Sequence, residues 1–304
     1  MLANNNESAN HARVMDLHQI ARRAGDLPAF PSTAMAAMQQ MDNPEVSAKG
    51  LQYVVAKDQA LTARILKIVN SAMYCFEKEV ATLSHAIAIL GLDTVRSIIV
   101  AAAVQQIFQK GSPPATDLSS KLFWEHSFGA AVAAKAIAAR CNYPVPEEAF
   151  SCGLLHDMGK MVMLKNQSQL YQEILNEVYC GEATFIEAEL QAFGYTHAHL
   201  GSLLALKWHF PTQLVEGILY HHDYAGAPTY QRLAAITSLA DSMMVVLEVG
   251  FRKDKSLKLE DEASAKYLNL AAPALQKTVA ELQTMIPSLS SSARGQGARR
   301  TAGR

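Results

Sequence analysis

The chain has 304 residues, of which 50% are hydrophobic, and its formal net charge is -1 at pH 7. This length allows a sizeable core in one large domain or two lobes, and the near-zero charge gives no support for nucleic-acid binding, which usually requires a basic excess. The four cysteines form no CxxC pair, so we expect reduced thiols in a reducing, cytoplasmic compartment: Cys75, Cys141, Cys152 and Cys180.

Residues 1–24 are predicted to form a polar arm that leads into a helix, and the first 19 contain no apolar core typical of a secretory signal. The most apolar stretch, 98–108, is too short to span a bilayer. A second apolar stretch, 233–247, is interrupted by Asp241. We therefore expect no membrane insertion and a soluble protein.

The first lobe is predicted over residues 25–112. Prolines at 28 and 31 favour an extended lead-in at 27–31. Helices are then predicted at 32–41, 47–56, 58–70 and 83–90. Asp58 can cap the third of these, whose apolar residues recur at helical spacing, and Asp93 is predicted to cap a long apolar helix that runs to Phe108. The KGSPP segment at 110–114 is the clearest internal break, and we place the boundary between the lobes there.

The second lobe is predicted over residues 113–250. One helix is expected at 117–141, and Pro146 followed by two glutamates begins another that runs to about Asp157. Further helices are expected at 168–180, 183–193, 198–209, 212–221 and 230–249. No segment alternates between apolar and polar residues over a useful length, so the chain is predicted to be all-α.

The C-terminal part is predicted as a helix or helix pair within residues 251–287, interrupted at Pro273. The last segment, 288–304, is rich in Ser, Gly, Ala and Arg and contains no acidic residue. Its composition favours a disordered, solvated tail, with binding of an acidic partner as the alternative.

The dipeptide His156-Asp157, within GLLHDMGK at 153–160, is the most informative feature. A neutral imidazole beside a carboxylate offers one nitrogen and one oxygen ligand to a divalent metal. Seven of the ten histidines fall between His126 and His222, on several predicted helices. This layout predicts a metal site that is assembled from segments far apart in the chain.

The predicted site holds one or two ions of iron, manganese, zinc or nickel. The first ion would use His126, His156, Asp157 and Asp241, and the second would use His197, His221 and His222, with Asp157 as a bridge. Such an ion polarises a phosphoryl oxygen and generates hydroxide near neutral pH. Lys160 lies three residues after Asp157, where its charge could neutralise a phosphate oxygen. Asp157 and Lys160 are therefore the candidate catalytic residues.

Structural roles are the alternative for several of these residues. His126, near two phenylalanines, could be a hydrogen-bonded core histidine, and burial as a small hydrophobe is favoured over metal binding for Cys152. Asp241 lies in an apolar helix, where a carboxylate is rare without a partner, and this favours a ligand role. His199 is two residues from His197, so the two side chains cannot point the same way on a helix, and His197 is the preferred ligand. His209, in an aromatic and proline-containing segment, is interpreted as structural.

These motifs resemble the HDOD family (HD-related output domain), which is related to the HD phosphohydrolases and HD-GYP phosphodiesterases. The resemblance extends from about residue 27 to Asp241 and rests on LPAFP at 27–31, DQALTAR at 58–64, NSAMY at 70–74, HAIAILGL at 85–92, WEHS at 124–127, GLLHDMGK at 153–160, THA at 196–198 and YHH at 220–222. It implies an all-helical fold, with an N-terminal helical lobe and an HD-like lobe, and a role as a bacterial signal-transduction output module. Many members resemble HD enzymes that have lost metal ligands, whereas in this chain seven residues occupy plausible ligand positions: His126, His156, Asp157, His197, His221, His222 and Asp241.

Two functions are compatible with the sequence. The favoured one is a regulatory module that acts through a signalling protein partner, with a nucleotide as a candidate ligand. The other is a metal-dependent phosphohydrolase acting on a nucleotide or cyclic nucleotide. Residues 223–228 (DYAGAP) lack the GYP signature, so hydrolysis of cyclic di-GMP is not expected. Either function is compatible with a metal that only holds the helices together, and the first is also compatible with a site that has no metal.

Overall fold

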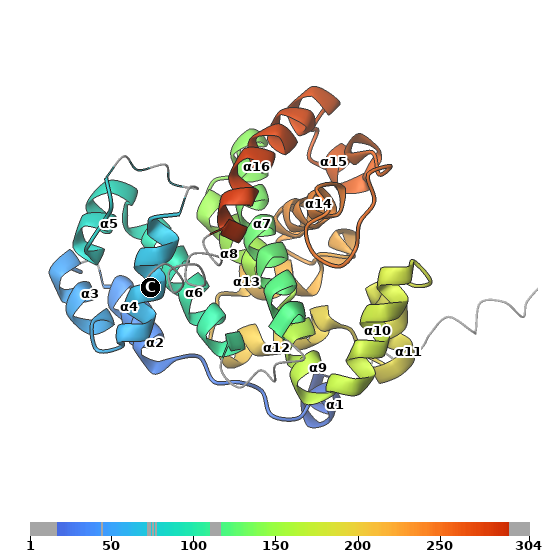
Figure 1. Ribbon diagram of the computed structural model, residues 1–304, viewed down its shortest axis with the longest axis horizontal. Helices are drawn as coiled ribbons and strands as arrows, with labels where there is room; N and C mark the ends of the chain where they lie inside the picture. The colour runs from blue at the N-terminus through green and yellow to red at the C-terminus, as the bar shows by residue number, and fades with distance from the viewer. Residues whose placement is uncertain are drawn as a thin grey trace, which may run out of the picture.

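The structure is a computed structural model, and it describes residues 17–43, 45–71, 74, 76, 78–109 and 117–291 (Figure 1). The described residues form helices, turns and loops and contain no strand, which confirms the predicted all-α fold. The first helices along the chain are α1 (Leu17–Arg23), α2 (Ser32–Met41), α3 (Ala48–Val55), α4 (Gln59–Val69), α5 (Leu83–Leu90) and α6 (Leu92–Gln109). The later helices are α7 (Asp117–Arg140), α8 (Pro146–Leu155), α9 (Met158–Asn166), α10 (Ser168–Cys180), α11 (Phe185–Phe193), α12 (His197–Lys207), α13 (Thr212–Leu219), α14 (Gln231–Val246), α15 (Ala263–Tyr267) and α16 (Ala272–Ser291), with short 3₁₀ turns η2 (Tyr224–Gly226) and η3 (Leu259–Asp261).

Helices α2 to α6 make up the first lobe, at the left of Figure 1. Their starts follow from capping: the side chains of Ser47, Asp58 and Thr82 accept hydrogen bonds from backbone N–H groups in the first turns of α3, α4 and α5. Asn70, at the end of α4, holds the following loop, because its Oδ1 accepts from the N–H of Val80 at 2.7 Å and its Nδ2 donates to the Val80 carbonyl at 2.9 Å. The predicted helix bounds in this lobe are correct to within a few residues.

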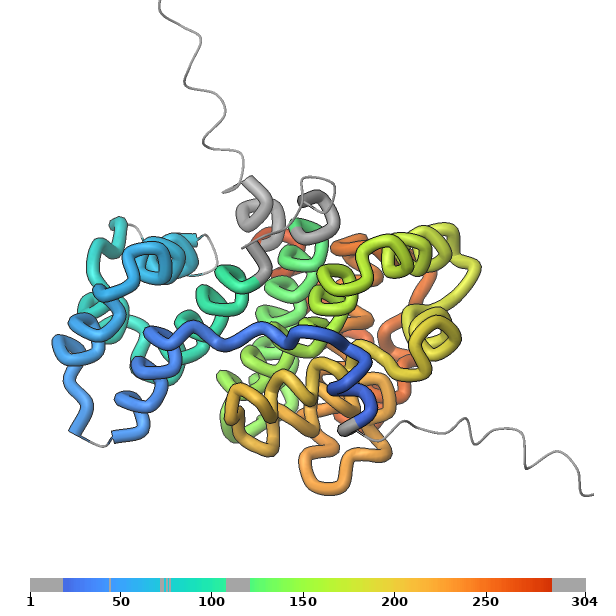
Figure 2. The backbone as a smooth tube through the Cα atoms, turned by 90° about the horizontal axis from the view of Figure 1, so that it is seen from below, coloured from blue at the N-terminus to red at the C-terminus, as the bar shows by residue number. Residues whose placement is uncertain are grey.

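An extended segment crosses from α1 to the first lobe along the surface of the second (Figure 2). Helix α1 itself packs on α12. The indole Nε1–H of Trp208 donates to the carbonyl of Pro28 at 2.9 Å, and the ring of Phe30 lies 5.2 Å from that of Trp208. The proline-rich lead-in is therefore a strap that holds the two lobes together.

The second lobe is built around α7, against which α8, α14 and α16 pack. Helices α9, α12 and α13 form the neighbouring layer, and α10 and α11 form an antiparallel pair at the edge (Figure 1). Glycine permits the closest approach in this lobe, because a Cβ on Gly159 of α9 would overlap the backbone carbonyl of His197 on α12. The metal-ligand candidates all belong to this lobe.

Four details differ from the predictions. The helix that begins at Pro146 ends at Leu155, and a separate helix, α9, follows; its residues 158–164 are all buried, so the sequence shows no amphipathic period there. Asp93 lies inside the first turn of α6, which begins at Leu92, and is not its cap. Pro273 lies in the first turn of α16 and does not interrupt a helix.

The fourth difference concerns the tail, because α16 continues to Ser291 and the predicted disorder at 288–291 is wrong. The rest of the tail, the arm at 1–16 and the inter-lobe break at 110–114 lie outside the described residues. Among the described residues, no helix combines the length and the hydropathy needed to cross a membrane.

Candidate metal centre

The corner between α8 and α9 presents the His-Asp pair to the interior of the second lobe. His156 is the C-cap residue of α8 and Asp157 is the N-cap residue of α9, so neither side chain is confined to the face of a continuous helix. The two are 0% and 2% exposed. A carboxylate as buried as Asp157 needs cationic or hydrogen-bonding partners.

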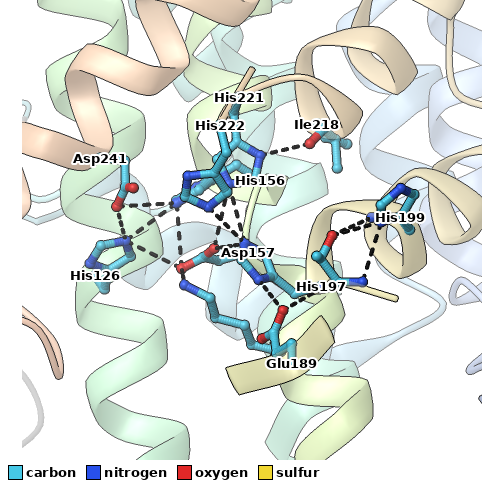
Figure 3. A network of polar contacts seen from close by, with 12 residues as sticks. His126, His156, Asp157, Glu189, His197, His199, Ile218, His221, His222 and Asp241 are labelled. Carbon is cyan, nitrogen blue, oxygen red and sulfur yellow. Dashed lines mark hydrogen bonds and ion pairs between the residues drawn. The ribbon is translucent and has the colours of Figure 1, made fainter. Parts of the chain in front are cut away.

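A first group of ligand atoms surrounds one oxygen of Asp157 (Figure 3). Oδ2 of Asp157 lies 3.4 Å from Nε2 of His126 and 3.5 Å from Nε2 of His156. Oδ1 of Asp241, on α14, lies 3.1 Å from Nε2 of His126 and 3.8 Å from Nε2 of His156. The four residues that were assigned to one ion from the sequence therefore converge.

A second group faces the other oxygen of the same carboxylate (Figure 3). Oδ1 of Asp157 lies 3.3 Å from Nε2 of His197 and 3.9 Å from Nε2 of His221. Nε2 of His197 is 3.3 Å from Nε2 of His221 and 3.1 Å from Nε2 of His222. Asp157 thus lies between the two groups, and the ligand role of all seven residues stays a prediction.

Hydrogen bonds to the far side of three of the imidazoles aim Nε2 at the centre. Nδ1 of His156 donates to the carbonyl of Gly153 and Nδ1 of His221 donates to that of Ile218, both at 2.7 Å. Nδ1 of His126 lies 3.1 Å from the carbonyl of Val249. Because a carbonyl oxygen can only accept, these rings carry their proton on Nδ1 and leave Nε2 for another partner.

This arrangement fits a metal ion on two grounds. With Nδ1 as the donor in His197 and His221, two Nε2 lone pairs face one another at 3.3 Å, which is unfavourable unless a cation lies between them. In addition, the buried Oδ1 of Asp157 receives no hydrogen bond from any described residue. Ligand atoms that share an ion at about 2.1 Å lie about 3.0–3.4 Å apart, which matches the shorter contacts here.

Electrostatics hold the two carboxylates in the form that a cation binds. Burial alone would raise the pKa of Asp157 and of Asp241, yet the pKa of each lies well below its usual value because imidazoles surround both, and Lys160 lies beside Asp157. Burial lowers the pKa of His221, and the neighbouring imidazoles lower it further. Burial also opposes protonation of His156, but the carboxylates of Asp157 and Asp241 outweigh it and raise its pKa, so a proton and a metal ion would compete for this ring.

Lys160 lies in the centre and is 4% exposed. Its ammonium donates to Oδ2 of Asp157 at 2.7 Å and lies 3.9 Å from the ring centroid of Phe185. The predicted role, contact with a phosphate oxygen, stays a prediction. In this structure the ammonium balances the charge of the Asp157 carboxylate.

Glu189 of α11 is a residue of the site that the sequence analysis missed. Its Oε2 lies 2.7 Å from Nδ1 of His197 and accepts the backbone N–H of His197 at 2.7 Å, while its Oε1 accepts the hydroxyl of Tyr171 at 2.7 Å. The side chain is completely buried. One signal could have found it: Glu189 lies midway between Phe185 and Phe193, four residues from each, on the face of the helix that should be apolar.

We predict that Glu189→Gln lowers the affinity of the second group for a divalent metal by about 10- to 100-fold. The amide preserves the size of the side chain but removes the charge that fixes the His197 ring. Competitive metal titration against a chromogenic chelator measures the change. Glu187→Gln, two residues away in the exposed capping box of α11, is the matched control. Equal affinities in Glu189→Gln and the unaltered protein would contradict the orienting role.

The other candidates lie outside the centre. His199 closes a capping box with Thr196 at the start of α12, where its Nδ1 is 2.7 Å from the threonine hydroxyl, so His197 and His199 do point in different directions. Cys152 is completely buried, and burial raises the pKa of its thiol to about 12, which agrees with a core role. His209 has φ 57° just after α12 and belongs to a turn.

Comparison with known proteins places the chain in a family. The model of the HDOD domain matches residues 27–224, about two thirds of the chain. The chain belongs to the HDOD family. A structure of an HDOD domain protein of unknown function from Geobacter sulfurreducens superposes with a TM-score of 0.70 at 26% identity, covering 91% of this chain and 93% of that one.

Two further proteins are similar. A "putative phosphohydrolase" from Shewanella amazonensis SB2B has a TM-score of 0.73 at 23% identity, covering 91% of this HDOD chain and 99% of that chain, and this similarity concerns the fold. An uncharacterized protein from Treponema pallidum (strain Nichols) is 26% identical over 240 residues, which are 75% of this chain and 44% of that protein. The HDOD chain thus spans less than half the length of that relative.

Proposed function

We propose that this HDOD protein is a regulatory output module whose second lobe holds one or two divalent metal ions. The observation that carries the proposal is the convergence of two groups of ligand atoms on the two oxygens of Asp157, one of which has no hydrogen-bond donor among the described residues. His126, His156 and Asp241 would hold the first ion, and His197, His221 and His222 the second. Iron, manganese, zinc and nickel suit these ligands.

Helix α8 provides a path between this centre and the first lobe. In its first turn, the carboxylate of Glu147 accepts the hydroxyl of Thr94 on α6 at 2.8 Å. One turn later, Ser151 lies 3.3 Å from Ser97 of α6 in a buried contact. The opposite end of the same helix is capped by His156. A change in the position of His156 on metal binding would therefore shift the contacts of α8 with α6. A signalling partner that contacts the first lobe could respond to that shift.

Two measurements test the module. Metal analysis of the purified protein is expected to find about one to two equivalents, and less than about half an equivalent in folded protein would contradict the metal centre.

Adding Mn²⁺ to metal-free protein is expected to slow amide hydrogen exchange in α8 and also in α6. Glu147→Gln is expected to retain the metal but to weaken the effect on α6. Protection confined to the second lobe of the unaltered protein would contradict the regulatory path.

A second function, metal-dependent phosphoester hydrolysis, is favoured by Asp157 and Lys160. When bound, the ions would supply Lewis acidity and a hydroxide near neutral pH. The bridging carboxylate of Asp157 would hold both ions, and Lys160 would exchange its contact with Asp157 for a phosphate oxygen. Lys160→Met tests this: turnover of nucleotide substrates is expected to fall about 100-fold while the metal content is retained. Turnover that survives this change, or that is absent from the metal-loaded protein, would contradict it.

A further inference from the structure

A cleft of about 710 Å³ opens in the second lobe between two segments that are far apart in the sequence. One wall is the turn between α10 and α11, including Tyr179 and Thr184, and the other is residues 251–254, which follow α14. This volume falls within the range of small-molecule sites. None of the lining residues is one of the metal-ligand candidates, so the cleft is distinct from the metal centre.

Both walls continue directly into residues that contact the metal centre. Val249, two residues before Phe251, lies 3.1 Å through its carbonyl from Nδ1 of His126. The ring of Phe185, the residue after Thr184, lies 3.9 Å from the ammonium of Lys160. A molecule in the cleft would therefore press on segments that orient one ligand and the buried lysine.

The free charged hydrogen-bond donors of the cleft belong to two side chains, among three carboxylates in the lining. Arg252 and Lys253 are exposed, and no salt bridge or hydrogen bond engages either side chain within the described ranges. Asp254 lies near enough to Arg252, and Glu248 near enough to Lys253, for a longer-range electrostatic attraction. Two of the acids are already engaged: Glu187 accepts the N–H and the hydroxyl of Thr184, at 2.9 and 2.8 Å, and Asp254 accepts the N–H and hydroxyl of Ser256, at 2.9 and 2.6 Å. The third acid, Glu182, is exposed to solvent.

The cleft also offers aromatic surface. Tyr179 is 69% exposed, a large value for an aromatic side chain, and Phe251 is partly buried against Phe123, with ring centroids 4.9 Å apart. A guanidinium and an ammonium bind phosphate oxygens well, and aromatic rings stack on planar heterocycles. The combination is suited to a ligand that carries both groups.

We infer that this cleft binds a phosphorylated ligand with a planar ring, such as a nucleoside monophosphate, with Arg252 and Lys253 on the phosphate and Phe251 and Tyr179 on the ring. This inference rests on the proposed function in one respect: the ligand would be the input signal of the regulatory module. Binding in the cleft uses none of the metal ligands. The ligand therefore binds to metal-free protein as well as to metal-loaded protein.

The test uses AMP as the probe, with adenosine and inorganic phosphate as matched fragments. Cys180, which is exposed and lines the cleft, reports occupancy through its rate of alkylation, and the buried Cys152 serves as an internal reference. AMP is expected to slow alkylation of Cys180 and to bind at least about tenfold more tightly than either fragment. Arg252→Gln and Lys253→Gln are each expected to weaken AMP binding about tenfold without changing the metal content.

Lys255→Gln is the control, because Lys255 belongs to the same segment but pairs with Glu248 at 2.8 Å and does not line the cleft. It removes the same charge and is expected to leave AMP binding unchanged. The inference is overturned if AMP does not bind at millimolar concentration, if all three variants bind it equally, or if adenosine or phosphate binds as tightly as AMP. If the protein binds AMP in this way but takes up no metal, this result contradicts the proposed function, whereas the inference about the cleft still holds.

Discussion

Replacing Asp157 with asparagine is expected to abolish metal binding by both groups of ligands. One carboxylate supplies an oxygen to each group, at 3.4 Å from Nε2 of His126 and 3.3 Å from Nε2 of His197. Altering residues that merely orient a ligand already costs about 10- to 100-fold in affinity, so losing the shared ligand should cost more than about 100-fold. Metal analysis after equilibrium dialysis measures this.

The same substitution is expected to destabilise the metal-free protein by about 3–5 kcal/mol, because it leaves the ammonium of Lys160 buried without its counter-ion. Urea unfolding in the presence of a chelator gives the free energy of unfolding. Asp42→Asn is the matched control: Asp42 pairs with Arg96 at 2.8 Å but its side chain is 67% exposed, so its loss should cost about 1 kcal/mol or less. Similar losses in the two variants would contradict a buried charge pair at the centre.

If Asp157→Asn fails to fold, Asp241→Asn can distinguish metal binding by the first group from metal binding by the second. Asp241 makes its short contacts with the first group, through His126 and His156. Its side chain is 19% exposed, so its loss disturbs the core less. Metal is expected to be lost from the first group and retained by the second. Loss of all bound metal in Asp241→Asn would show that the centre holds a single ion.

Gly159→Ala is expected to destabilise the second lobe by at least about 3 kcal/mol, at or above the upper end of the usual cost of overpacking. The added methyl group would overlap the backbone carbonyl of His197, and backbone cannot rotate away as a side chain can. Helices α9 and α12 must therefore separate, which moves His197 away from Asp157. Thermal and urea unfolding measure the stability, and metal titration measures the expected weakening of the second group.

Gly50→Ala provides the control for this substitution. Gly50 also lies within a helix, α3, but a Cβ there would meet the flexible end of Gln40 and the hydroxyl of Ser47. The change is expected to alter the free energy of unfolding by no more than about 1 kcal/mol, since alanine is a better helix former than glycine. A Gly159→Ala protein as stable as Gly50→Ala would show that α9 and α12 pack less closely than described.

Local sequence was sufficient for most of the fold. Asp58 marks a helix start because a capping side chain bonds within three residues of itself, and the helical apolar period is visible over a few turns. The exception is α9, which has no polar face because it is buried on all sides. The residue types of the site were also visible, because histidines cluster between residues 126 and 222 and a carboxylate such as Asp241 is uncommon within an apolar helix.

Only the tertiary structure decided how these groups meet. The distances within the two groups of ligand atoms, the contact of Glu189 with His197 and the cleft beside residues 251–254 all join segments separated by many residues. Such contacts depend on the angles and distances at which helices pack, and these are set by the fit of many side chains at once, including the absence of one at Gly159. The sequence by itself thus determined the helices, the candidate ligand types and their expected grouping, while packing determined how close these groups lie and what lies next to them.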